Sequence, residues 1–388
     1  MTPWKRTLWI VWFAEFTSIV GFSVILPILP LYIPQLGVSD PRAVTFWSGA
    51  AMSAQAVAMA VMAPIWGAVA DRYGRKLMVE RAMFGGALVI GLMGFARTVE
   101  QLILLRMLQG VLTGTIAAAN TLVASTVPRE RSGYAMGLLQ MAIYLGASVG
   151  PLIGGVVTDT IGFRPAFWIT SALLTIGGLL IALMVKENFV PEKRTGSGQS
   201  SVALLLTGAM LSAMSVRLIV RIASQMTNPI LPLFVETLAP AGRVATLSGL
   251  VRGANAATGA IGALALGRAS DRLGHRTILI ACAVASALLY AGQFLAQDVL
   301  VLTVLQAGSG LAMGGMLAAL MANLARLTPE GRHGAVYGFD TTTTSIANAI
   351  APMLGSGLAM GWGLRAPFLA SAAFFALGGV VIARLMKT

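Results

Sequence analysis

The sequence is poor in residues that carry metal and disulfide chemistry, with one cysteine, Cys282, and two histidines among 388 residues. A single cysteine cannot form an intramolecular disulfide. Together these three side chains are too few for a credible metal cluster. The pattern GxxxxGK[ST], whose backbone binds nucleotide phosphates, is also missing. We therefore expect no disulfide framework, no metal and no nucleotide or other cofactor.

Charged residues are scarce as well, at 11% of the chain, against roughly a quarter in water-soluble domains. Hydrophobic residues make up 57%, which is the composition of an integral membrane protein. The net charge of +13 comes largely from short loops between apolar runs. The positive-inside rule places such loops, and with them both chain termini, in the cytoplasm. The basic balance therefore does not indicate nucleic-acid binding.

Twelve apolar runs are long enough to cross a bilayer, which takes about 20 residues. They fall roughly at 8–33, 44–67, 77–96, 101–124, 134–158, 163–185, 205–236, 244–266, 276–296, 299–324, 334–360 and 364–385. A polar stretch beginning at Lys186 separates the first six from the last six. The sequence predicts an all-α protein with a six-helix bundle at 1–185, a cytoplasmic linker at 186–204 and a second six-helix bundle at 205–388.

The two halves repeat at an offset of about 201 residues. PILPLYI from Pro27 matches PILPLFV from Pro229, and GAVADRYGRK from Gly67 matches GRASDRLGHR from Gly267. Internal repeats of this kind are typical of transporters, in which the substrate binds between the halves near mid-membrane. We therefore expect two pseudo-symmetric halves.

Three motifs together resemble the major facilitator superfamily over essentially the whole chain, and most closely its twelve-span drug/proton antiporters, which include bacterial tetracycline and multidrug exporters. The loop after the second run carries Gly67, Asp71, Arg72, Gly74, Arg75 and Lys76; the fourth run carries LLRMLQG; and the fifth carries Gly146, Gly150, Pro151, Gly154 and Gly155. The fifth-run pattern GxxxGPxxGG is the exporter-specific one. The resemblance implies proton-driven antiport in a bacterial inner membrane.

The loop motif suggests a gate on the cytoplasmic side. Its glycines permit a tight turn, and its basic residues stay at the membrane surface. Asp71 runs against the local positive charge, so it is expected to pair with Arg75 or to face a helix N-terminus. The second half copies the pattern around Asp271. The alternative is a solvated loop that only sets the orientation.

The fifth-run glycines recur every four residues and therefore share one helix face. Small residues on such a face let a neighbouring backbone approach closely, and Pro151 removes a helix hydrogen bond. We expect this packing to control closure of the outer side, although plain helix packing would leave the same pattern.

Polar side chains form stripes on two predicted spans, and a stripe of this kind is costly against lipid. The residues expected to line the substrate cavity are Arg106, Gln109, Tyr144, Arg217, Arg221, Gln225 and Asn228. We also expect flexible apolar side chains to line part of this cavity.

Of fourteen acids, only Glu15 and Asp340 fall clearly within predicted spans. The repeat offset places Glu15 opposite Arg217. A carboxylate whose surroundings alternate between wet and dry can exchange a proton in each cycle. Glu15 and Asp340 are therefore the candidate proton-coupling residues; a static ion pair is the alternative for Glu15, and a cytoplasmic-end position for Asp340.

The sequence thus predicts a monomeric, proton-coupled multidrug efflux antiporter for lipophilic drug-like compounds, working among membrane lipids by alternating access. An exporter or flippase for a specific anionic lipid or organic acid is the nearest alternative. Four arginines lie well inside the predicted spans, against the two acids named above, and this excess of positive charge would suit an anion: Arg106, Arg217, Arg221 and Arg252. A membrane enzyme is disfavoured, since no convincing nucleophile–base set is present. A sensor that binds ligand without transport is the remaining possibility.

Overall fold

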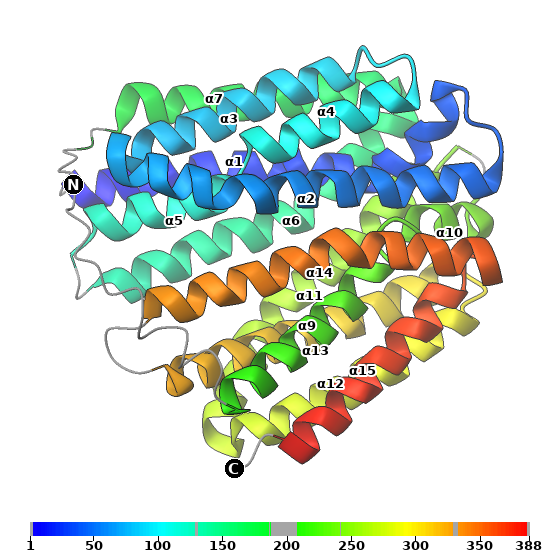
Figure 1. Cartoon of the computed structure of the whole chain (residues 1–388). Helices are drawn as coiled ribbons and strands as arrows, with labels where there is room; N and C mark the ends of the chain where they lie inside the picture. The colour runs from blue at the N-terminus through cyan, green and yellow to red at the C-terminus, as the bar shows by residue number, and fades with distance from the viewer. Residues whose placement is uncertain are drawn as a thin grey trace. The chain divides into compact units, whose positions relative to one another are not determined.

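The structure is a computed structural model, and it describes residues 3–128, 131–185, 187, 208–240, 242–328 and 333–385. In these ranges the regular elements are helices (Figure 1). The first half holds α1 (Pro3–Tyr32), η1 (Ile33–Leu36), α2 (Pro41–Tyr73), α3 (Arg75–Met93), α4 (Val99–Leu112), α5 (Thr115–Thr126), α6 (Ser132–Ile161) and α7 (Phe163–Met184). The second half holds α9 (Gly208–Met226), α10 (Leu231–Leu238), α11 (Val244–Leu273), α12 (His275–Leu295), α13 (Val299–Leu327), α14 (His333–Trp362) and α15 (Ala366–Leu385). The all-α prediction is confirmed.

Eight stretches of the described residues are long and apolar enough to cross a membrane: Trp4–Leu36, Pro41–Ala70, Tyr134–Ile161, Phe163–Met184, Met210–Leu238, His275–Leu295, Val299–Leu324 and Ala366–Arg384. The predicted runs at 77–96, 101–124, 244–266 and 334–360 correspond to α3, to the pair α4 and α5, to α11 and to α14. These helices are interrupted or more polar; α3, for example, begins with charged residues at Arg75, Lys76, Glu80 and Arg81.

The chain divides into two compact units. Unit 1 comprises residues 1–193 and 240–253, and unit 2 comprises residues 194–239 and 254–388. The helix α11 therefore begins in unit 1 and continues into unit 2. Of the predicted linker 186–204, only Glu187 lies within the described residues.

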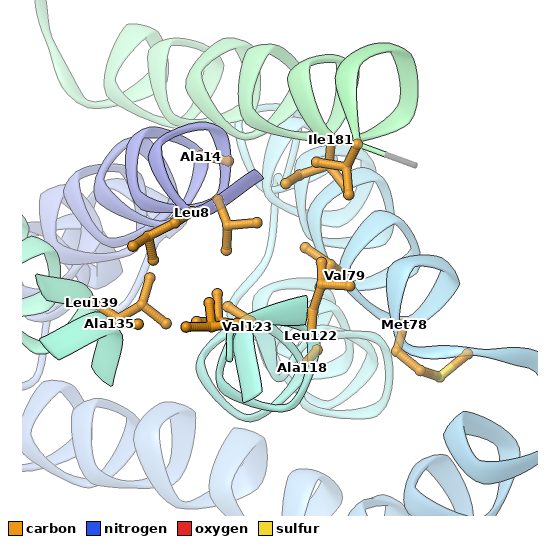
Figure 2. Close-up of a cluster of buried hydrophobic side chains, with 14 of the residues drawn as sticks. Leu8, Ala14, Met78, Val79, Ala118, Leu122, Val123, Ala135, Leu139 and Ile181 are labelled. Carbon is orange, nitrogen blue, oxygen red and sulfur yellow. The ribbon is translucent and has the colours of Figure 1, made fainter. Parts of the chain in front are cut away.

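The core of unit 1 is a cluster of apolar side chains from five helices (Figure 2). Leu8 and Ala14 come from α1, Val79 from α3, Leu122 from α5 and Ile181 from α7, and α6 adds further members. Each of these five side chains is at most 1% exposed. The cluster therefore fixes the position of α1, which carries Glu15.

The fourth predicted span is two helices rather than one. Between α4 and α5, Gly114 has a φ of 128°, which favours glycine. The carbonyls near this break find side-chain donors: the Trp66 indole donates to the Val111 carbonyl (2.7 Å), and the Arg81 guanidinium donates to the Thr113 carbonyl (3.5 Å). The Arg81 guanidinium also lies 3.8 Å from the centre of the Trp66 ring. The seventh predicted span is likewise divided, into α9 and α10.

Candidate functional site

Glu15 lies in the middle of α1 and is 1% exposed. The Thr115 side chain, at the start of α5, interacts with it, and the Ser18 hydroxyl donates to the Thr115 hydroxyl (3.3 Å). Neither carboxylate oxygen of Glu15 has a partner of hydrogen-bond geometry among the described residues. A buried carboxylate in this position is costly when ionised. Access of water to Glu15 would therefore decide how costly its ionised form is.

Arg106 is also buried in unit 1, at 4% exposed. Its Nε donates to the Ala51 carbonyl (3.1 Å) and its Nη1 to Oε1 of Gln109 (2.7 Å). Both acceptors are neutral, so the hydrogen bonds leave the positive charge in place. The predicted stripe on α4 is thus brought together with the backbone of α2.

In unit 2, the stripe on α9 faces α14. The Arg221 Nε donates to Oδ1 of Asn348 (2.9 Å), and the Gln225 amide donates to the same oxygen (3.1 Å). The Asn228 amide in turn donates to Oε1 of Gln225 (2.7 Å). We call this chain of side chains the α9–α14 ladder. Its members are Arg221, Gln225 and Asn228, which are three of the four predicted cavity residues of the second half, together with Asn348.

Asp340 forms an ion pair with Arg217 at one end of this ladder. Their side chains are 7% and 12% exposed. This pairing was not predicted: the expected partner of Arg217 was Glu15, which belongs to unit 1, and that pairing stays a prediction. Among the described residues of unit 2, Asp340 supplies the negative charge that balances Arg217.

The fifth-span glycines form a tight contact with α1. A Cβ atom added to Gly146 would lie 2.9 Å from Ile19 Cβ, and one added to Gly150 would lie 2.5 Å from the Val20 carbonyl oxygen. A Cβ on Gly154 would run into the Val24 backbone. The helix α6 runs without a break through Pro151. The expected close approach of a neighbouring backbone is thus present, and the neighbour is α1.

Gly155 points to a different partner from the other three glycines. A Cβ there would overlap the backbone of Ala245, at the start of α11. The α6 helix therefore uses two glycine faces, one on α1 and one on the first turns of α11. Tyr144, expected in the cavity, is partly buried on the same helix.

The loop motif is only partly a turn. Gly74 has a φ of 100° and separates α2 from α3, as expected for a turn glycine. Gly67 instead lies inside α2, and a Cβ there would meet no atom within 4 Å, so its predicted role in the turn is wrong. Arg72 is exposed and Arg75 partly buried. The Asp71 side chain lies outside the described residues, and Asp271 is exposed in the last turn of α11.

An acid that the sequence did not single out occupies the N-terminus of α3. The Glu187 carboxylate accepts hydrogen bonds from the backbone N–H groups of Arg75 (3.0 Å) and Lys76 (2.8 Å). A carboxylate at a helix N-terminus is favoured by the unpaired N–H groups and by the helix dipole. Its signal in the sequence was weak, because it is one of two acids in the mixed-charge polar stretch that begins at Lys186. Glu187 thus occupies the N-terminus of α3, whereas the role of Asp71 stays a prediction, because its side chain lies outside the described residues.

Buried charges inside long apolar helices, a two-half repeat and close glycine packing together define a multi-pass membrane transporter. The family model of the Major Facilitator Superfamily matches residues 11–220 and 205–388. The chain belongs to this superfamily. The prediction of a transporter rather than an enzyme is thereby confirmed, and its cargo is a small molecule.

Several curated relatives cover nearly the whole chain. It is 36% identical over 373 residues to the Multidrug resistance protein MdtG of Enterobacter lignolyticus, covering 95% of this chain and 89% of that protein. The MdtG proteins of Dickeya zeae and Salmonella typhimurium are also 36% identical, covering 95% of this chain and 91% and 92% of theirs. The resemblance to multidrug exporters is confirmed at this level.

Solved structures share the fold at low sequence identity. A bacterial homologue of the human lysosomal transporter Spinster, inward-facing and occupied, has a TM-score of 0.82 at 15% identity, covering 100% of this chain and 98% of that one. The nucleoside transporter NupG has a TM-score of 0.80 at 14% identity, covering 100% of this chain and 100% of that one. These likenesses establish the fold.

Proposed function

We propose that this chain is a proton-coupled multidrug efflux antiporter, which exports lipophilic drug-like compounds by alternating access. The observation that carries the proposal is the 36% identity to the MdtG multidrug resistance proteins over 95% of the chain. The setting is a bacterial inner membrane with both termini in the cytoplasm, where the chain works as a monomer among membrane lipids. The energy comes from the proton gradient, and no cofactor takes part.

Glu15 supports proton coupling through its position. It is buried, and in the described part of the chain its carboxylate interacts with the neutral Thr115 side chain, with no partner of full hydrogen-bond geometry. A proton bound from the outside neutralises the carboxylate and lowers the cost of its burial, whereas water reaching the site from the inside favours release. Because drug and proton favour opposite states of the same transporter, proton entry discharges the drug. Asp340 is the second candidate. The positive charge of Arg217 competes with the proton for its carboxylate.

The test is uptake of a fluorescent cationic dye into proteoliposomes of purified protein under an imposed pH gradient. Antiport predicts that the dye moves against its own gradient, towards the side with more protons, and stops when a protonophore collapses the gradient. Empty liposomes control for passive partitioning of the dye into the acidic compartment. Dye movement that is equal with and without protein would refute the proposal.

A second candidate function is export of an anionic lipid or organic acid. It is favoured by Arg106 and Arg221, whose described hydrogen bonds go to neutral groups. Such cations attract an anionic group more strongly than a cationic drug. Competition decides between the two: an anionic lipid analogue should displace a bound dye if this function holds, and a second cationic drug should displace it if multidrug export holds.

A further inference from the structure

The α6 helix and the first turns of α11 interlock through glycines, all within unit 1. A Cβ on Gly249 would run into the Pro151 carbonyl, and one on Gly253 would lie 2.5 Å from the Ser148 carbonyl oxygen. The Ser148 hydroxyl donates to the Gly253 carbonyl (3.2 Å). The two backbones are therefore in direct contact over about two turns of helix.

A single acid closes one end of this contact. The Asp159 carboxylate, near the end of α6, accepts hydrogen bonds from the backbone N–H groups of Thr246 (2.7 Å) and Ala245 (3.3 Å). These N–H groups belong to the first turn of α11, where N–H groups have no partner within the helix. Asp159 therefore caps a helix that is remote from it in the sequence, using an ionised acceptor and the helix dipole.

The capped helix is the one that both units share. Its first turns, up to Gly253, belong to unit 1, and its remainder belongs to unit 2. In unit 2 that remainder packs closely on α13, where Gly310 leaves no room for a Cβ against the Asn255 carbonyl. Because α11 is one continuous helix, the contact between α6 and residues 244–253 holds the start of a helix that continues into unit 2.

We propose that Asp159 is a latch: its hydrogen bonds to Thr246 and Ala245 hold the outer side shut and break in every transport cycle. The inference rests on the proposed function, because alternating access requires the outer side to close and to open again in each cycle. Close packing at a glycine fixes a distance but carries no charge, whereas the two hydrogen bonds to Asp159 are charge-assisted and directional. The hydrogen bonds of Asp159 thus fix one position of α11 against α6, which we assign to the closed state.

Two other acids in unit 1 cap helix N-termini without holding this position. Asp40 accepts from the N–H groups of Arg42 (3.4 Å) and Ala43 (3.0 Å), at the start of its own helix α2. Glu187 caps α3, which lies entirely in unit 1. Neither joins unit 1 to a helix that continues into unit 2. Asp40 is therefore a matched control: it is the same residue type with the same two-bond pattern, but it caps only its own helix.

The test measures how often the contact opens, using a cysteine as reporter. Ser248 is fully buried, at 0% exposed, in the first turns of α11. Protein carrying Cys282→Ala and Ser248→Cys is placed in lipid nanodiscs, where both faces are accessible, and the rate of reaction with a polar maleimide is recorded. Asp159→Ala should raise this rate roughly tenfold, the factor expected for losing charge-assisted hydrogen bonds.

Asp159→Asn keeps the side-chain size and should raise the rate less, about threefold, because the amide oxygen still accepts a hydrogen bond. Asp40→Ala should leave the rate unchanged. The latch is overturned if the Asp159 variants react at the parent rate, or if Asp40→Ala accelerates the reaction as much as Asp159→Ala does. Should Asp159→Ala fail to fold, the Asp159→Asn rate decides alone. Labelling uses neither drug nor proton gradient, so a failure of the antiport assay leaves this result readable.

Discussion

The two units place their buried acids in opposite surroundings. In unit 1, Glu15 interacts with the Thr115 side chain, and the neighbouring helices α5 and α6 contain no basic residue. In unit 2, Asp340 is ion-paired with Arg217, one turn from Arg221. A lone buried carboxylate gains most from binding a proton, whereas one beside an arginine is stabilised in its ionised form. The comparison shows that two halves of similar sequence surround their buried acids with different charges.

The same contrast appears where the halves correspond in sequence. Arg106 and Gln306 both lie about two turns into helices that begin at Val99 and Val299. Arg106 donates to the Ala51 carbonyl and to Gln109, whereas the Gln306 amide donates to Gln293 (3.1 Å) within a buried cluster of neutral side chains. Unit 1 holds a buried charge at a position where unit 2 holds an amide. The repeat preserves packing and changes charge.

The largest effect is expected for Glu15→Gln. The change keeps shape and hydrogen-bonding capacity but removes titration, so uphill, pH-driven export should be lost while drug binding persists, weakened for cationic drugs. Export in proteoliposomes and dye binding to purified protein measure the two separately. Asp340→Asn is the paired variant that sharpens the comparison. If Glu15→Gln exports at the wild-type rate and Asp340→Asn does not, the roles of the two acids are reversed.

The next effect is on stability. Asp340→Asn leaves Arg217 buried without its counter-charge, and breaking a buried ion pair in this way costs about 3–5 kcal/mol. The melting temperature of the purified variant should fall, and adding Arg217→Gln should recover most of the loss. Glu15→Gln should change the melting temperature little or raise it, since it removes a charge with no described ion-pair partner. Equal losses for both single variants would erase the distinction between the acids.

A smaller effect is expected where both halves pack alike. Gly150→Leu should overpack the contact with Val20 and cost about 1–3 kcal/mol, slowing transport. Gly137→Leu, on the same helix, is the control, because a Cβ at Gly137 meets no atom within 4 Å. In unit 2, a Cβ on Gly355 would run into the Met226 backbone, so Gly355→Leu should behave as Gly150→Leu does. Wild-type transport by well-expressed Gly150→Leu would place that face against lipid.

The smallest effect is expected in the two loops that the halves repeat, around Asp71 and Asp271. Asp71→Asn should slow transport of every substrate alike, by about two- to fivefold, the value of one carboxylate near a helix end. Asp271→Asn provides the comparison in the second half. The measurement is the initial export rate of three unrelated drugs by each variant. A loss confined to one drug would argue against a gate and for a contact with cargo.

Much of the fold follows from local patterns in the sequence. Runs of apolar residues predicted the helices, and the four-residue spacing of Gly146, Gly150 and Gly154 predicted a face that a backbone approaches closely. The break at Gly114 was not predicted, because hydropathy continues across it, and its carbonyls are satisfied by Trp66 and Arg81, which lie on other helices. A hydropathy profile records side chains rather than hydrogen bonds of the backbone.

The pairings within the candidate site were harder to predict than its members. Asp340 and Arg217 were both identified, but their pairing depends on how α9 and α14 are aligned along their axes, over more than a hundred residues of intervening sequence. Asp159 and Glu187 escaped notice because their partners are backbone N–H groups, which every residue except proline has. A sequence motif cannot mark a partner of that kind.

The tight contact between α1 and the glycines of α6 has a consequence for synthesis of the protein. The α1 helix leaves the ribosome before α6 does, and its most apolar stretch is 83% buried in the finished molecule. The backbone of α6 that covers Ile19, Val20 and Val24 is made more than a hundred residues later, a delay of roughly 6–25 s at ordinary elongation rates. During that interval Glu15 faces lipid or the insertion machinery, where a protonated carboxyl is the less costly form. The residue proposed to carry protons in the mature transporter is thus expected to be neutral when it enters the membrane.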